Sequence, residues 1–262
     1  MTAPYTPQQV MPGALAAAVD TTACWFVIGG QAVRCFAPYR PSVDVDFGVE
    51  SAASLDDLVR QLRRTGSVDI QERTPGTVHL LWNGLKVSAF VLPQMVSFVE
   101  DRHLDVTGVL ATKLHVILDR GLRRDFFDLY VMLEQHRLGI ASLLAAMRKV
   151  HHDQIDDNLL LRALTYFDDA DREPRLPGEG AGDWSLVKDY FLTQVGRLLL
   201  PPSRKLGIQA HTMDVADRPG PEKTRTAAQT RVRKLSPASS PRTPSAGRSS
   251  RGSRAGSRRR SS

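Results

Sequence analysis

The stretch that decides the fold runs from residue 27 to residue 47 and reads VIGGQAVRCFAPYRPSVDVDF. With the apolar residues before it, residues 23–28 form a continuous apolar run that is short enough for a buried strand. Gly29-Gly30 ends this strand, and the next six residues are compatible with a helix. Residues 43–49 alternate in the manner of a second strand. We therefore expect the order strand, glycine turn, helix, strand.

The two aspartates in this stretch are candidate metal ligands. Side chains in a strand alternate between faces, so Asp44 and Asp46 are expected to point the same way. Two neighbouring carboxylates repel each other, and Mg²⁺, which prefers carboxylates together with phosphate oxygens, would compensate that repulsion. Gly29 and Gly30, at a helix start, let backbone amides approach a phosphate without an intervening Cβ. Alone, each motif is more typical of a solvated face or a turn; in this order they predict a site for Mg-NTP.

The remainder of the first hundred residues predicts a short helix at residues 11–22, a second helix and a β-hairpin. Ser54 is expected to cap a helix that runs to about Arg64, with acidic residues in its first turn. Residues 78–82 and 85–91 read as two strands, and Asn83-Gly84 between them tolerates the positive φ angles of a two-residue turn.

The second half of the chain has helical periodicity. Helices are expected at residues 107–120, 123–137, 139–150, 156–166 and 183–198. Strands are thus concentrated in one half and helices in the other, which predicts an α+β protein and not an alternating βαβ array. We expect a mixed sheet domain at 1–104, a helical domain at 105–200 and a tail at 201–262.

The basic character of the chain belongs to that tail. The net charge is +7, but residues 201–262 hold 15 Lys and Arg against 3 Asp and Glu, which leaves 20 against 25 in residues 1–200. The tail is rich in Ser, Pro, Gly and Arg and poor in apolar residues, so it is expected to be disordered. The N-terminal residues resemble no leader, and no apolar run is long enough to span a membrane, so we expect a cytoplasmic protein without a membrane partner.

The order of apolar strand, Gly29-Gly30, short helix, loop and Asp44-Val45-Asp46-Phe47 resembles the opening of the DNA polymerase β-like nucleotidyltransferase fold. That resemblance implies a small mixed sheet with flanking helices. It also implies that Asp44 and Asp46 bind metal and that Gly29 and Gly30 bind the triphosphate.

A narrower resemblance appears downstream. Lys113-Leu114, then Arg120, then a run that reads RDFFDLY from Arg124 to Tyr130, is similar to the AbiEii/AbiGii toxins, which include the MenT-type toxins of toxin–antitoxin pairs. The resemblance covers roughly residues 24–195 and leaves out the tail.

This resemblance implies roles for further residues. Lys113 would contact a phosphate or the transition state, and Asp125 would act near the acceptor or support Lys113. Arg34 and Arg120 would belong to the nucleotide-binding residues. Asp128, together with Arg120, would hold the residues that contact the substrate in position.

The activity that the resemblance implies is transfer of a nucleoside monophosphate from an NTP to an acceptor hydroxyl, with loss of pyrophosphate. Mg²⁺ is the expected cofactor, with Mn²⁺ as a second option, and an NTP is the expected substrate. Such toxins modify tRNA acceptor ends, so tRNA or another RNA is the expected acceptor and an antitoxin protein the expected partner.

One residue departs from the family pattern. Polymerase β-like enzymes usually carry a third carboxylate on a later strand, where this chain has Ser88. Serine does not hold a metal as an anion does. Either Asp125 or Glu50 takes its place, one metal suffices, or activity is lost; we favour a reduced metal site. Two other functions stay open: transfer to a small molecule, in keeping with the acidic first 200 residues, and non-catalytic binding.

Overall fold

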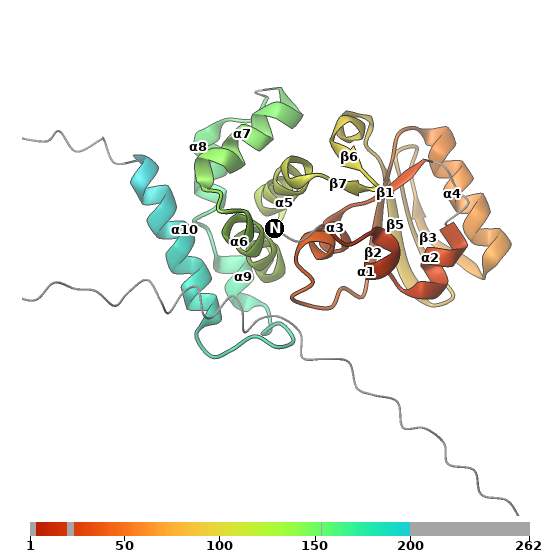
Figure 1. Cartoon of the computed structure of the whole chain (residues 1–262), viewed down its shortest axis with the longest axis horizontal. Coiled ribbons are helices and arrows are strands. Elements are labelled where there is room, and N and C mark those ends of the chain that lie inside the picture. The colour runs from red at the N-terminus through yellow and green to blue at the C-terminus, as the bar shows by residue number, and fades with distance from the viewer. Residues whose placement is uncertain (1–3, 20–23, 153, 200–262) are drawn as a thin grey trace, which may run out of the picture.

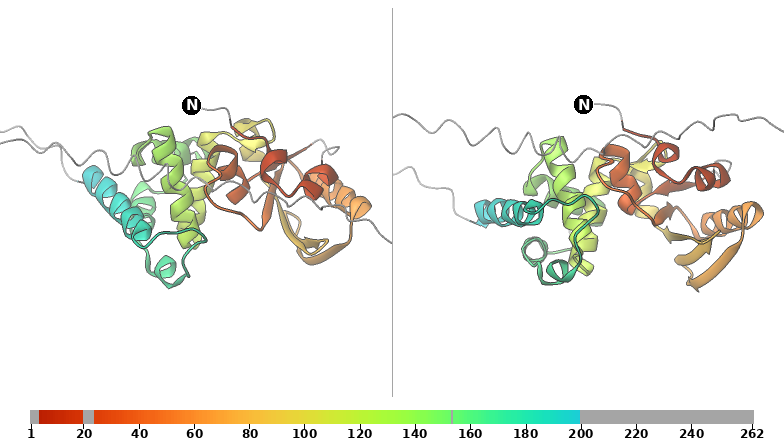
Figure 2. Two further views of the ribbon diagram at one scale, coloured as in Figure 1. Left: turned by 60° about the horizontal axis from the view of Figure 1, so that its bottom comes forward. Right: turned by 90° about the horizontal axis from the view of Figure 1, so that it is seen from below.

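The computed structural model describes residues 4–19, 24–152 and 154–199. Figure 1 shows two unlike halves, with the strands and helices α1–α4 on one side and helices α5–α10 on the other, and the turned views of Figure 2 show the same division. The expected α+β class is confirmed. We propose residues 1–104 and 105–200 as domains on this arrangement. The tail predicted to be disordered, 201–262, lies outside the described residues.

The strands form one mixed sheet with the order β3-β4-β5-β2-β1-β7-β6. β1 and β2 are antiparallel, β2 and β5 are parallel, and β5 pairs with β4 in an antiparallel hairpin. The strands are β1 (Trp25–Val27), β2 (Val45–Val49), β3 (Val68–Arg73), β4 (Thr77–Trp82), β5 (Leu85–Val91), β6 (Val99–Glu100) and β7 (His103–Leu104).

The first helices are α1 (Pro7–Val10), α2 (Gly13–Val19), α3 (Gly29–Phe36) and α4 (Ala52–Thr65), and a 3₁₀ helix, η1, covers Pro93–Phe98. α4 buries Leu55, Leu58, Val59 and Leu62 and packs against β2 and β5. It begins earlier than expected, because Ser51 and not Ser54 is the N-cap: the Ser51 hydroxyl accepts a hydrogen bond from the amide of Ser54.

The helical half consists of α5 (Val106–Asp119), α6 (Arg123–His136), α7 (Ile140–His151), α8 (Asp157–Ala163), α9 (Asp168–Arg172) and α10 (Asp183–Leu199). α5 packs against α6 and α7 and also reaches α3 and β7, so it joins the two halves. The helix expected at 156–166 is shorter, ending at Ala163, and α9 follows it as a separate turn of helix.

The hairpin prediction is confirmed in detail. Asn83 and Gly84 have φ angles of 49° and 82°, as a two-residue turn of this kind requires. β3, β6, β7 and η1 were not predicted; β3 is largely exposed and lacks the apolar alternation by which a strand is recognised. No helix among the described residues is long and apolar enough to cross a membrane.

Candidate active site

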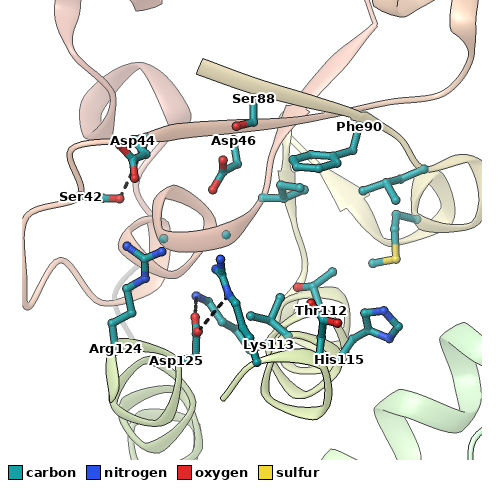
Figure 3. A pocket seen from close by; sticks show the side chains of 18 of the residues that line it. Ser42, Asp44, Asp46, Ser88, Phe90, Thr112, Lys113, His115, Arg124 and Asp125 are labelled. Carbon is teal, nitrogen blue, oxygen red and sulfur yellow. Dashed lines mark hydrogen bonds and ion pairs between the residues drawn. The ribbon is translucent and has the colours of Figure 1, made fainter. Parts of the chain in front are cut away.

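A pocket of about 640 Å³ lies between the sheet and helix α5. Figure 3 shows Asp44, Asp46 and Ser88 on the sheet side, facing Lys113, Arg124 and Asp125 on the helical side. The residues that line the pocket include, among those predicted from the sequence, Gly29, Gly30, Asp44, Asp46, Lys113, Arg120 and Asp125. Segments up to about a hundred residues apart in the chain therefore meet at one site.

The two glycines allow the backbone to approach this site. Gly29 has a φ of 60°, and a Cβ there would lie 2.6 Å from Oδ2 of Asp46. A Cβ on Gly30 would lie 2.7 Å from Oγ of Ser42. A side chain at either position would collide with the groups that line the pocket, and Gly29 in addition has a backbone conformation that favours glycine. Gly29 and Gly30 both line the pocket, so the start of α3, the end of a helix at which anions bind, borders it.

Asp46 lies on β2, and Asp44 precedes the first residue of that strand. Burial raises the pKa of Asp46; Lys113 opposes this rise and the neighbouring Asp44 adds to it. No ion pair within 4.0 Å joins either carboxylate to a basic side chain of the described residues. The pair therefore has negative charge that the protein compensates only in part, which suits a cation.

The third position of the expected carboxylate set is held by Ser88. β2 and β5 are in register with Asp46 opposite Ser88, so the serine is the direct neighbour of the metal-ligand candidate. In the described part of the chain, no group of three or more His, Cys, Asp and Glu side chains is arranged for a metal. The donor set fits Mg²⁺ that takes its other ligands from substrate phosphate and water.

Lys113 projects from α5 between two aspartates of α6. Its Nζ lies 3.1 Å from Oδ1 of Asp125 and 2.7 Å from Oδ2 of Asp128, and the residue is only 5% exposed. Burial alone would lower the pKa of Lys113, but the two carboxylates outweigh it and raise the pKa. The ammonium group is thus held charged at the pocket wall.

Asp128 is surrounded by donors. It is completely buried and accepts hydrogen bonds from Oη of Tyr39 at 2.6 Å and from Nε and Nη2 of Arg40 at 2.9 and 2.6 Å, besides Lys113. Burial would raise the pKa of Asp128, yet Lys113 and Arg40 together lower it. Tyr39 and Arg40 belong to the loop between α3 and β2, so this network fastens the glycine-turn region to α6.

Asp125 is less completely bonded than Asp128. It is 1% exposed, Lys113 donates to Oδ1, and Oδ2 has no hydrogen-bond partner although Nε of Arg120 lies 3.8 Å away. Arg120 is half exposed at the pocket rim. A buried carboxylate oxygen without a donor, at the wall of a pocket, is suited to receive a hydrogen bond from a ligand.

Arg34 is not part of this site. Its guanidinium donates to the carbonyl of Val10 and to Oε1 of Gln31, and it does not line the pocket. The residue lies within α3, where the side chain is directed toward α1, so its expected place among nucleotide-binding residues is corrected. Arg40, which the sequence analysis did not predict as a site residue, lines the pocket instead.

His79 was missed as well. It lies opposite Ser88 on β4, and its Nδ1 is 3.0 Å from Oγ of Ser88. A two-residue turn fixes the register of a hairpin, so Asn83-Gly84 already placed residue 79 opposite residue 88. That signal was present in the sequence.

Comparison with known families gives a match in the second half of the chain. Residues 89–202 match the model of the family described as "Nucleotidyl transferase AbiEii toxin, Type IV TA system". This segment is similar to that family. It contains Lys113, Arg120, Asp125 and Asp128, whereas the glycine turn, Asp44 and Asp46 precede it.

Two further proteins are similar to this chain. An uncharacterized protein of Aquifex aeolicus (strain VF5) is 25% identical over 184 residues, which are 67% of this chain and 88% of that protein. A crystal structure of a candidate nucleotidyltransferase from H. pylori has 17% identity and a TM-score of 0.44, covering 73% of this chain and 94% of the other.

Proposed function

We propose that the protein is a Mg²⁺-dependent nucleotidyltransferase that transfers a nucleoside monophosphate from an NTP to a hydroxyl of tRNA. One observation carries this proposal: the Asp46 carboxylate lies directly against the glycine turn at the start of α3, facing the buried ammonium of Lys113 across one pocket. Phosphate-binding amides, a metal-binding carboxylate and a fixed cation are the groups that phosphoryl transfer needs.

Each group has a distinct task in this proposal. The amides at Gly29 and Gly30 bind the triphosphate, and Lys113 stabilises the negative charge that develops at the α-phosphate. Asp44 and Asp46 would hold a divalent cation, which supplies charge neutralisation at the attacking and leaving oxygens. Asp125 offers its free oxygen, Oδ2, to the acceptor side.

The acceptor and the partner are inferred from the family. AbiEii proteins are the toxins of type IV toxin–antitoxin systems, which supports a cognate antitoxin as protein partner. Arg120 and Arg124 line the same pocket on the helical side, and their positive charges suit a phosphate of an RNA end. An RNA acceptor therefore fits this wall better than a cationic small molecule does.

The experiment is a transfer assay with total tRNA, Mg²⁺ and each of the four α-labelled NTPs. We expect label in tRNA, and an Asp46→Asn variant is expected to lower the rate about 10³-fold because it removes a metal-binding charge. Asp69→Asn is the matched control, since Asp69 lies exposed on β3 of the same sheet and outside the pocket. The control should transfer at the wild-type rate.

Two other outcomes of the transfer assay would contradict this proposal. Label that enters small acceptors but never RNA would replace the tRNA proposal by a small-molecule transferase. No transfer to RNA, protein or small molecules, with Mg²⁺ or with Mn²⁺, would contradict the enzyme and favour a binding protein with this fold.

A further inference from the structure

Three side chains form a row across the pocket face of the sheet. Asp46 on β2 is opposite Ser88 on β5, and Ser88 is opposite His79 on β4. Residues in register on adjacent strands point to the same face. All three line the pocket, and the row ends at the imidazole of His79.

The imidazole is held in one place by two contacts. Nδ1 of His79 lies 3.0 Å from Oγ of Ser88, and the ring meets Phe90 edge to face with centroids 5.6 Å apart. Phe90 is two residues beyond Ser88 on the same strand face. The ring orientation is therefore determined by β5.

Either partner can be the donor in the hydrogen bond between His79 and Ser88, and the ring tautomer decides which. When Nδ1–H of His79 donates to Oγ of Ser88, the other ring nitrogen, Nε2, keeps its lone pair. The serine hydroxyl, which is opposite Asp46 in the strand register, then has its own proton left to donate. This tautomer is the one in which Nε2 is able to accept a proton.

We propose that His79 is a catalytic residue: Nε2 accepts the proton of the acceptor hydroxyl, and Ser88 positions the ring, so that the pair works where related enzymes have a third carboxylate. The inference rests on the proposed nucleotidyl transfer. As the acceptor oxygen forms its bond to the α-phosphorus, the bond from that phosphorus to the leaving oxygen breaks and pyrophosphate departs. The hydroxyl proton passes to Nε2 and from there to water, so one acceptor and one NTP give one nucleotidylated acceptor, pyrophosphate and a proton.

The other histidines of the pocket are less suited to this task. His115 and His151 lie on α5 and α7, stacked on each other with centroids 5.2 Å apart, and neither is in register with the Asp46 strand. A base must reach the hydroxyl that attacks at the metal-binding carboxylates. Of the pocket histidines in the described chain, His79 is the one tied to Asp46 through a single residue.

The test uses the full chain, total tRNA, Mg²⁺ and the NTP that labels best. His79→Asn keeps an amide at the place of Nδ1 but lacks Nε2, so kcat is expected to fall about 10²- to 10⁴-fold. The KM for NTP is expected to stay within about threefold, because the triphosphate is bound by the glycine turn. His152→Asn is the matched control: His152 is exposed, lies outside the pocket and has a φ of 51°, which asparagine tolerates. It should behave as wild type.

The positioning role of Ser88 is tested separately and also serves if His79→Asn does not fold. Ser88→Ala is expected to lower kcat about tenfold or more. Ser88→Thr keeps a hydroxyl and is well suited to a strand, so it is expected to keep most of the rate. Equal rates for Ser88→Ala and Ser88→Thr would overturn the positioning role of Ser88.

The outcomes separate the two proposals. If wild type transfers label and His79→Asn does so with unchanged kcat, the inference about His79 fails while the function stands. A raised KM for NTP with unchanged kcat would also overturn it, since the ring would then bind nucleotide instead of accepting a proton. If wild type transfers nothing to any acceptor, the proposed function itself fails.

Discussion

Asp125 and Asp128 lie on the same face of α6, one turn apart, and both contact Lys113. They differ in how completely their carboxylate oxygens are bonded. Asp128 is bonded by three side chains, two of them from the loop before β2. Asp125 has one bonded oxygen and one, Oδ2, without a hydrogen-bond partner.

On the proposed function, this difference separates a carboxylate that holds the site together from one that is available to a ligand. A buried anion with all its lone pairs satisfied has no capacity left for a ligand, and removing it leaves buried cations uncompensated. A buried anion with a free oxygen retains a cost that a substrate donor can relieve. We therefore propose that Asp128 supports the fold and that Asp125 is the carboxylate that receives a hydrogen bond from the substrate.

The largest effect is expected for Asp128→Asn. Arg40 and Lys113 would lose the charge that both contact, and Arg40 has no other acidic partner among the described residues. Breaking a buried ion pair from one side costs about 3–5 kcal/mol. We expect urea unfolding to show a loss of that size in the free energy of unfolding, together with a loosened loop at Tyr39 and Arg40.

The dependence on pH checks the cause of this loss. The pKa of Asp128 is lowered, since Lys113 and Arg40 outweigh burial, so its stabilisation is present above the ordinary aspartate pKa of about 3.9 and is lost as pH falls through the folded value. The difference between wild type and Asp128→Asn should thus be constant between about pH 5 and pH 7 and shrink below about pH 4.

Asp171 provides a matched control for the Asp128→Asn variant. Its pKa is also lowered, by hydrogen bonds from Trp184 and Lys188, but the residue is exposed. Solvent screening limits such a pair, so Asp171→Asn is expected to cost less than about 1 kcal/mol. A loss as large as that of Asp128→Asn would show that burial is not what distinguishes them.

The next effect is expected in catalysis, for Asp125→Asn. Asparagine can keep the bond from Lys113, but it removes the anionic oxygen offered to the substrate, so the rate of nucleotidyl transfer should fall about 10²-fold. The free energy of unfolding should change by no more than about 1 kcal/mol, because one oxygen is already unsatisfied. Single-turnover transfer to tRNA and urea unfolding measure the two quantities. An unchanged rate with a large loss of stability would exchange the roles of the two aspartates.

The sequence shows both aspartates but not this difference. Local patterns predict the glycine turn, the strand with Asp46 and the Asn83-Gly84 hairpin, because each depends on neighbouring residues and the periodicity of the chain. The bonds from Arg40 to Asp128 join residues 88 positions apart, and nothing in the local pattern of either residue indicates the other. Tertiary packing decides which of two equivalent carboxylates is satisfied.

Arg34 and β3 are two further features that local sequence patterns did not predict correctly. A basic residue one turn into α3 is plausible for phosphate binding, but the direction of its side chain depends on where α1 packs. β3 is an exposed strand on the edge of the sheet, where apolar alternation is not required. His79 is the exception, since the two-residue turn fixes the hairpin register and thereby places its side chain opposite Ser88.

The smallest effect is expected for Tyr39→Phe. This change removes the Oη donor at 2.6 Å from Oδ1 of Asp128, while Nε of Arg40 continues to donate to the same oxygen. Because the acceptor stays satisfied, the cost should be that of one hydrogen bond, about 1 kcal/mol in urea unfolding. Tyr166→Phe is the control: Tyr166 is 55% exposed, so its change should stay within about 0.5 kcal/mol.

Tyr39 does not line the pocket, so the transfer rate should be that of wild type. A tenfold fall in rate with Tyr39→Phe would mean that Asp128 positions Lys113 for catalysis through this one donor, and the separation between a supporting and a working carboxylate would no longer hold. A retained rate with the expected loss of stability leaves Asp128 as the anchor of the loop and Asp125 as the group that meets the substrate.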